Sequence, residues 1–249
     1  MIRFMRPGDA VEVRDVFRRS FPLHLQQFMV YGQPGLDKYL VDILKYPGLF
    51  PNFKLYVFDD ALGIGYAEFR IDDTKNEGFL SNIFVDARLR GRGAGSQLIR
   101  HFLGRHPELT RVSLDVFESN PAAQRLYQRL GFKPESCRHW YVKPLRHLEG
   151  QEAPVPVLQQ PLPSVAMFER YGFSEFQLVG SGLKFGRIGP GVLRCHHPVD
   201  ADNEALLLVL QQHFPEVAQA FCITSETLPE PWQKIDTSWR MVLHREGCR

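Results

Sequence analysis

Residues 88–95 read RLRGRGAG, and the flanking sequence indicates which structural elements lie on either side of this stretch. The apolar run Phe79–Val85 precedes it and is rich in strand-forming residues. Apolar residues at helical spacing follow it: Leu98, Ile99, Phe102 and Leu103. The pattern predicts a strand, a short glycine-rich loop and a helix. Gly93 and Gly95 remove side chains where the first turn of that helix presents unpaired N–H donors and a positive dipole end.

Arg90 and Arg92 add positive charge to this loop, which therefore predicts a cradle for a phosphate or diphosphate. A glycine-rich turn before a helix is common, so the loop alone is a weak signal. It is not a Walker A loop, because no Gly-Lys-Ser/Thr follows, and G-x-G-x-x-G is not completed. It resembles the Arg/Gln-x-x-Gly-x-Gly/Ala loop of the GNAT superfamily, whose members are N-acyltransferases that use acetyl-CoA or another acyl-CoA. The resemblance implies that one run of residues holds the pyrophosphate: Arg90, Gly91, Arg92, Gly93, Ala94, Gly95 and Ser96.

A second motif lies at residues 120–132, which read NPAAQRLYQRLGF. Asn120 is expected to cap a helix that has Pro121 at its first position and ends at Gly131. The segment is similar to the GNAT pattern Asn-x-x-Ala-x-x-Leu-Tyr-x-x-x-Gly-Phe. The two motifs occur in the family's order, and the resemblance covers Ile2 to about Val142.

The resemblance also implies how the cofactor and the catalytic groups are placed. In the family, the strands before the two motifs separate and the pantetheine arm enters between them. Phe84 and Val85 would then offer backbone groups to pantetheine, and Asn120 would contact the arm or the base of the site. Tyr127 occupies the family's usual general-acid position, and an N–H group near Val85 would stabilise the developing oxyanion.

The general base is less clear from the sequence. Many relatives carry an acidic residue on the strand before the glycine loop, but this chain has Ser81 and Asn82 there. Glu68, on the neighbouring expected strand, and Glu118 are the remaining candidates, and either carboxylate is otherwise a solvated strand charge. Water alone is a third alternative.

Acceptor recognition is expected from residues 21–35 and from the loop after Tyr141. Aromatic and imidazole side chains in these segments are candidates to line an amine pocket, although each also fits simple packing: His24, Tyr31, Trp140 and Tyr141.

The composition and the spacing of histidines and cysteines give no support to several other classes of function. The chain has 249 residues, 44% of them hydrophobic, and a net charge of +2, which gives no electrostatic case for nucleic acid or a membrane surface as partner. The nine histidines show no H-x-x-x-H pair, and the four cysteines are scattered, so no metal site is expected. With no signal-like N-terminus, a cytoplasmic protein is expected. Whether it forms a homodimer is left open.

The alternation of strands and helices predicts a mixed α/β fold (an α+β mixed sheet). We expect a GNAT-like acetyltransferase domain at residues 1–148, a proline-rich linker at 149–163 and a smaller α/β domain at 164–249. The final strand of the first domain is expected at residues 139–142 and the last strand of the chain near 238–244. If the second domain were only a support, residues 1–149 would bind CoA alone.

The second half contains a possible degenerate copy of the first. The string Val85-Asp86-Ala87 recurs as Val199-Asp200-Ala201, and Pro107-Glu108 recurs as Pro215-Glu216. About six residues are missing between the matched strings, at the place of the arginine–glycine loop. Coincidence between short strings is the alternative. If the repeat is real, only the first half should hold the CoA pyrophosphate.

We therefore predict an N-acetyltransferase that transfers an acetyl group from acetyl-CoA, or another acyl group from its acyl-CoA, to a primary amine of a small molecule or peptide by direct attack. Two alternatives remain: a protein or peptide N-terminal acetyltransferase, and a non-catalytic acyl-CoA sensor or interaction module.

Overall fold

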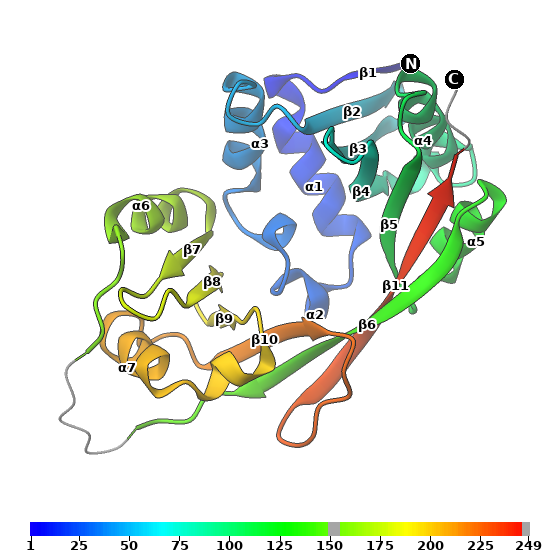
Figure 1. Ribbon diagram of the computed structural model, residues 1–249. Coiled ribbons are helices and arrows are strands. Elements are labelled where there is room, and N and C mark those ends of the chain that lie inside the picture. Colours follow the sequence, from blue (N-terminus) through cyan, green and yellow to red (C-terminus); the bar gives the residue numbers. More distant parts are fainter. Residues whose placement is uncertain (149–154, 246–249) are drawn as a thin grey trace. The chain divides into compact units, whose positions relative to one another are not determined.

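The computed structural model describes residues 1–148 and 155–245. These residues form two compact units that exchange segments of the chain (Figure 1). Unit 1 contains residues 1–22, 37–137 and the described residues from Ser238 on, and unit 2 contains residues 23–36 and 138–237. Each unit therefore takes segments from both sides of the expected 149–163 linker.

Unit 1 contains a mixed sheet with the strand order β1-β2-β3-β4-β5-β11. The first four strands pair antiparallel, β5 runs parallel to β4, and β11 runs antiparallel to β5. The bounds are β1 Ile2–Phe4, β2 Phe53–Asp60, β3 Gly63–Asp72, β4 Glu77–Val85, β5 Arg111–Phe117 and β11 Gln233–His244.

Helices cover both faces of this sheet. On one face, Phe102 of α4 stacks on Phe69 of β3 with ring centroids 3.7 Å apart, and both rings are fully buried. On the other face, Phe17 of α1 meets the edge of Phe84 of β4 at 5.5 Å. Each such buried phenylalanine contributes about 1.5–3 kcal/mol. The helices of this unit are α1 Ala10–Ser20, α3 Leu36–Lys45, α4 Ala94–Arg105 and α5 Pro121–Arg129, with 3-10 turns η1 Pro7–Asp9 and η3 Ala87–Leu89.

Unit 2 repeats this pattern. Its strands follow the order β6-β10-β9-β8-β7, with β7, β8 and β9 antiparallel and β10 parallel to β9. In both units a helix connects the third strand of the meander to the parallel strand: α4 in unit 1 and α7 in unit 2. The bounds are β6 Lys133–Pro144, α6 Pro161–Tyr171, β7 Phe173–Gln177, β8 Lys184–Ile188, β9 Val192–Arg194, η4 Pro198–Asp202, α7 Glu204–His213 and β10 Gln219–Thr224.

The two faces of the unit 2 sheet are covered by different parts of the chain. The apolar side of α7 packs with Phe176, Phe185 and Leu193 into one buried cluster. On the other face, Phe28 stacks on Phe221 with ring centroids 4.9 Å apart. Phe28 lies in the segment between α1 and α3, which contains α2 Leu23–Gln26 and η2 Val30–Gly32. Residues 23–36, which include most of the segment expected to recognise the acceptor, thus fold within unit 2.

Two strands are longer than the sequence predicted. The strand expected at 139–142 is β6, of 12 residues, and the strand expected at 238–244 is β11, also of 12 residues. Each begins in one unit and ends in the other, so periodicity fitted to a single domain finds only part of it.

The expected linker is only partly described. Residues 149–154, which include Pro154, lie outside the described residues. Beyond them, Leu158 forms a bridge with Leu178, and Pro161 and Pro163 lie in the first turn of α6. A proline is tolerated in the first turn because its missing N–H has no partner there anyway. The prolines that indicated a linker therefore also begin a helix.

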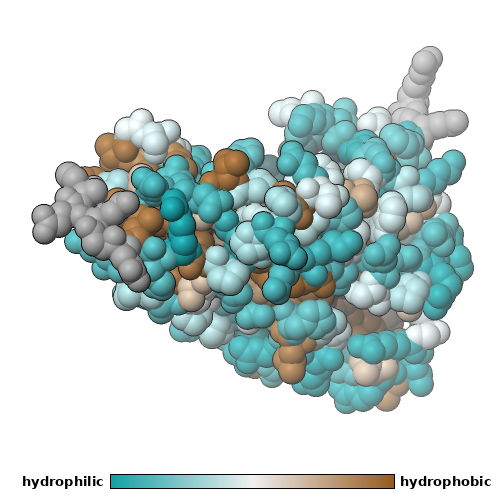
Figure 2. All heavy atoms as spheres, turned by 90° about the horizontal axis from the view of Figure 1, so that it is seen from below, coloured by the Kyte–Doolittle hydropathy of each residue, from teal (hydrophilic) through white to brown (hydrophobic). Residues whose placement is uncertain are grey.

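The surface seen in Figure 2 is mostly hydrophilic, with apolar side chains in separate patches. None of the helices described is both long enough and apolar enough to span a bilayer.

The structure predicts that the chain's last strand is needed to stabilise its first unit. Met241 of β11 is 2% exposed in the same buried cluster as Phe69 and Phe102. We expect Met241→Ala to lower the free energy of unfolding by about 2–5 kcal/mol, as other large-to-small core changes do. Chemical denaturation measures this, with Met167→Ala on the partly exposed side of α6 as the control. An equal loss in both variants would contradict the role given to β11.

Candidate functional site

The helix that follows the glycine loop begins without a capping side chain. Gly93 is the N-cap residue of α4, with a left-handed φ of 79° that favours glycine. The first helical hydrogen bond runs from the N–H of Gln97 to the carbonyl of Gly93 at 2.9 Å. The N–H groups of the residues between them have no acceptor within the helix. No acidic residue lies in this first turn, so nothing on the helix offsets its positive end.

The space beside this loop is open. A Cβ atom added to Gly93 would meet only the side-chain nitrogen of Gln97, at 3.8 Å, and one added to Gly91 would meet nothing within 4 Å. Gly91 also has a left-handed φ, of 76°. The loop backbone can therefore be approached closely by a ligand, which is the property that phosphate cradles require.

The three arginines of the loop are not equivalent. Arg88 is held by Asp86, with Nε and Nη2 donating to the two carboxylate oxygens at 2.9 and 3.0 Å. These hydrogen bonds hold the pKa of Asp86 well below its usual value. Arg90 and Arg92 are exposed, and within residues 1–148 and 155–245 neither guanidinium has an ion-pair partner. Arg90 and Arg92 are thus the loop cations available to an anion.

The strands before the two motifs separate, as the resemblance implied. The pairing of β4 with β5 ends at Leu80 and Leu114, although β4 continues to Val85 and β5 to Phe117. The side chain of Phe84 is buried, 5% exposed, against the aromatic residues on the α1 face. At this position only the backbone could serve a ligand between the strands.

The two motifs meet at Gly95. A Cβ atom there would lie 3.3 Å from a methyl group of Leu126 in α5, and within 4.0 Å of Ile83 and Val85 of β4. The end of β4, the start of α4 and the middle of α5 thus converge around one residue that has no side chain. The structure brings the predicted pyrophosphate loop and the predicted catalytic helix together.

Asn120 and Tyr127 occupy opposite ends of α5. The side-chain oxygen of Asn120 accepts the N–H of Ala123 at 3.1 Å, which confirms the predicted cap. Tyr127 is 4% exposed and its ring meets the edge of Phe132 at 6.1 Å. Burial raises the pKa of the Tyr127 phenol well above its usual value, so it is protonated at neutral pH.

The two candidate bases differ in their surroundings. Glu68 of β3 is 0% exposed, and its carboxylate accepts hydrogen bonds from Arg70 Nε at 3.2 Å and from the Tyr66 hydroxyl at 3.4 Å. Glu118 lies exposed in the turn after β5, where it accepts the indole N–H of Trp239 at 3.4 Å. Only Glu68 is desolvated.

The residues expected to line an amine pocket all belong to unit 2, but Trp140 and Tyr141 lie on opposite faces of its sheet. Trp140 packs near Phe221 at 5.3 Å, on the sheet face covered by residues 23–36. Tyr141, the next residue along β6, lies in the α7 cluster, and its hydroxyl accepts the N–H of Leu228 at 3.3 Å. Tyr31 is buried and His24 is exposed. Tyr141 is therefore a core residue of unit 2.

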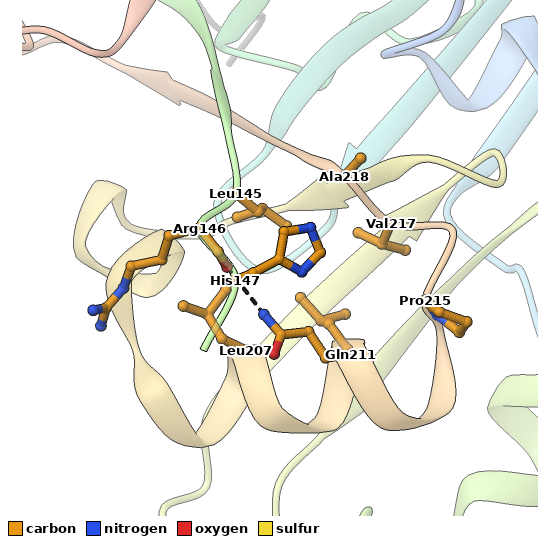
Figure 3. A pocket seen from close by; sticks show the side chains of 9 residues that line it. Leu145, Arg146, His147, Leu207, Gln211, Pro215, Val217 and Ala218 are labelled. Atoms are coloured by element: carbon orange, nitrogen blue, oxygen red, sulfur yellow. Dashed lines mark hydrogen bonds between the residues drawn. The ribbon is translucent and has the colours of Figure 1, made fainter. Parts of the chain in front are cut away.

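A small hollow in unit 2 lies between α7 and the chain after β6 (Figure 3). Its lining is largely apolar, and Gln211 donates to the carbonyl of Arg146 across it at 3.0 Å. None of the residues predicted to bind CoA lines it. The lining residues are Leu145, Arg146, His147, Leu207, Leu210, Gln211, Pro215, Val217 and Ala218.

The N-terminus of α7 is chemically the opposite of that of α4. Asn203 caps α7 by accepting the N–H of Leu206 at 3.0 Å, and Glu204 puts a carboxylate in the first turn. Both features satisfy the helix end that an anion would otherwise use. Residues 201–203 separate Asp200 from α7, whereas residues 87–93 separate Asp86 from α4, so the connecting loop is shorter in unit 2.

Residues 12–132 match the model of the Acetyltransferase (GNAT) family, and this part of the chain belongs to that family. Over 86 residues the chain is 33% identical to a spermine/spermidine N(1)-acetyltransferase of Bacillus subtilis, a stretch that is 32% of this chain and 57% of that protein. The chain thus spans a little over half the length of this curated relative.

Two solved structures match almost the whole chain. A tandem GNAT protein from the clavulanic acid biosynthesis pathway is 15% identical, with a TM-score of 0.63 over 98% of each chain. A candidate acetyltransferase of Pyrococcus horikoshii is 16% identical, with a TM-score of 0.57 over 99% of this chain and 90% of that one. At this identity the likeness concerns the fold, and it confirms that the second half resembles the first.

The open backbone at Gly93 gives a direct test of the cradle. We expect Gly93→Val to weaken CoA binding at least tenfold, because its side chain would occupy the space beside the N–H donors and its left-handed φ is disfavoured by about 1–2 kcal/mol. Titration calorimetry measures the affinity. Gly180→Val is the matched control, since Gly180 also has a left-handed φ and open surroundings but lies in unit 2. Unchanged affinity in Gly93→Val would contradict the cradle.

Proposed function

We propose that the protein is an acyl-CoA-dependent N-acyltransferase that transfers an acetyl group to a primary amine of a small molecule or peptide. One observation carries the proposal: the uncapped N-terminus of α4 lies next to a break in the pairing of β4 and β5. The first feature suits the diphosphate of CoA and the second suits an extended pantetheine arm. The membership of residues 12–132 in the GNAT family supports the same activity.

In this proposal the chain binds the cofactor through its backbone. The N–H groups at the start of α4 donate to the diphosphate, with Arg90 and Arg92 offsetting its charge. The exposed edge of β4 near Val85 pairs with the amides of the pantetheine arm as an added strand would. Acetyl-CoA supplies a thioester whose carbonyl carbon accepts the amine. An N–H group near Val85 donates to the carbonyl oxygen as negative charge develops there.

Tyr127 is proposed to assist the departure of the thiolate. Its burial keeps the proton on the phenol, but a raised pKa also makes it a weak acid. We therefore assign it a hydrogen bond to the sulfur as charge develops, with the proton passing over only as the attacking nitrogen gives up its own. The hydroxyl is a donor throughout and never carries a full negative charge.

The acceptor class rests on less direct support. The curated relative from Bacillus subtilis is named for spermine and spermidine, so polyamines belong in the first acceptor screen. A protein or peptide N-terminal amine is the second class to include. A non-catalytic acyl-CoA sensor is the rival function, because Ser81 and Asn82 stand where many relatives carry an acidic residue.

Thiol release from acetyl-CoA tests the activity. The wild-type protein is incubated with acetyl-CoA and a panel of polyamines, small primary amines and short peptides, and free thiol is measured over time. We expect at least one amine to raise thiol release well above solvent hydrolysis. Tight CoA binding without turnover on any amine would instead favour the sensor.

The role of Tyr127 is tested by Tyr127→Phe. We expect kcat to fall about 10²-fold or more, because general-acid assistance is of this size. CoA affinity should stay within about twofold, since a hydrogen bond made only as the thiolate departs does not contribute to binding. Steady-state kinetics and calorimetry on the same preparation measure both. Equal kcat in the two proteins would remove the acid role.

A further inference from the structure

The strand that borders the proposed site contains a bulge at Ser81. In the β3–β4 ladder, Phe69 pairs with Leu80 and Glu68 pairs with Asn82, so Ser81 is the extra residue of β4. Two residues of β4 therefore lie opposite Glu68. Bulges of this kind redirect side chains and are common beside active sites.

The bulge coincides with the point where the strands separate. Leu80 is the last residue of β4 that pairs with β5, and Ser81 follows it directly. The ladder places Glu68 beside this point on the neighbouring strand. Glu68 of β3 therefore lies opposite Ser81 and Asn82, the two β4 residues that stand where many relatives carry an acidic residue.

The surroundings of Ser81 are unusual for a hydroxyl. Its Oγ atom is buried and has no hydrogen-bond partner. A buried polar atom without a partner costs about 1–3 kcal/mol, so such an atom calls for a physical explanation. A hydroxyl group can accept one hydrogen bond and donate another, which makes it able to pass a proton between two neighbours.

Glu68 needs such an intermediary. Its side chain is 0% exposed, so a proton cannot reach it from bulk water without a neighbouring group. The carboxylate is held by Arg70 and Tyr66 on its own strand, and these contacts fix its position in the sheet. Glu68 thus offers a fixed, buried carboxylate on the strand opposite a hydroxyl group that makes no hydrogen bond in this structure. These are the two groups that a proton relay requires, and the relay needs the hydroxyl to turn toward the carboxylate.

We propose that Ser81 and Glu68 form the relay that removes the proton from the acceptor ammonium. This inference rests on the proposed function and identifies the base that the function needs. The ammonium N–H bond breaks, its proton goes to Ser81 Oγ, and the hydroxyl proton of Ser81 goes to the Glu68 carboxylate. The freed lone pair then forms the C–N bond as the C–S bond breaks.

Tyr127 and Glu68 each return to their starting protonation state at the end of the reaction. The nitrogen loses a second proton as the amide forms, and this proton replaces the one that Tyr127 gives to the sulfur. Glu68 returns the first proton through Ser81 to solvent before the next turnover. Each cycle thus yields the amide, the free thiol and one proton, with no other reactant needed.

The relay predicts a specific set of kinetic changes, measured with acetyl-CoA and the best acceptor from the amine panel. We expect Glu68→Gln and Ser81→Ala each to lower kcat by about 10²-fold or more. Ser81→Thr keeps the hydroxyl and should recover most of the lost rate. CoA affinity by calorimetry should stay within about twofold in all three variants, because none of these residues lies in the diphosphate cradle.

A nucleophile that needs no deprotonation separates the relay from a structural role. Hydroxylamine is uncharged at neutral pH, so Glu68→Gln and the wild-type protein should acetylate it at similar rates. Glu77 is a glutamate elsewhere on β4 that forms an ion pair, so Glu77→Gln is the matched control. We expect this variant to keep the wild-type kcat.

Two results would overturn the relay. Glu68→Gln or Ser81→Ala could retain wild-type kcat with the amine acceptor. The loss could instead persist with hydroxylamine, which would show that Glu68 acts on the fold. Failure of the proposed function looks different, because the wild-type protein would then release no thiol with any amine, whether or not it bound CoA.

Discussion

The candidate site depends on the point at which β4 and β5 stop pairing. β4 and β5 share hydrogen bonds only as far as Leu80 and Leu114, and both strands continue beyond that point without each other. The bulge at Ser81 begins at the same place, and bulges of this kind bend the strand that contains them. A sheet that stayed paired to Val85 would close the gap in which an extended ligand could lie. Pairing on the other side of β5, by β11, keeps that strand in place despite the gap.

The two units show how one topology supports opposite chemistry. Each has a meander, a helix and a parallel strand, but only α4 begins with glycine and no acidic residue. In α7 the same helix end is satisfied by Asn203 and faced by Glu204, each of which contributes about 1 kcal/mol to helix stability while making the end unsuitable for an anion. Unit 2 stabilises its own helix where unit 1 leaves donors for a ligand. We infer that one half binds cofactor and the other contributes structure, including a strand for unit 1.

Residue types at particular positions made part of the fold and of the candidate site predictable from the sequence. The cap at Asn120, the meander and the loop between β4 and α4 follow from residue types at fixed spacing, and the structure confirms these elements. The exchange of β6 and β11 between units could not be predicted, because periodicity reports which face of a strand is apolar and not which strand lies beside it. The bulge at Ser81 could not be predicted for the same reason, because a bulge is defined by how β4 pairs with β3. For Tyr141 the sequence left pocket and packing open, because an aromatic residue on a strand suits a core as well as a pocket, and the structure places it in the core.

The most direct test of the account is a crystal structure of the protein with CoA bound. The account predicts the diphosphate within hydrogen-bond distance of the N–H groups at the start of α4, with the pantetheine arm along the edge of β4 and no CoA at α7. A diphosphate held at α7, or CoA bound away from the gap between β4 and β5, would contradict it.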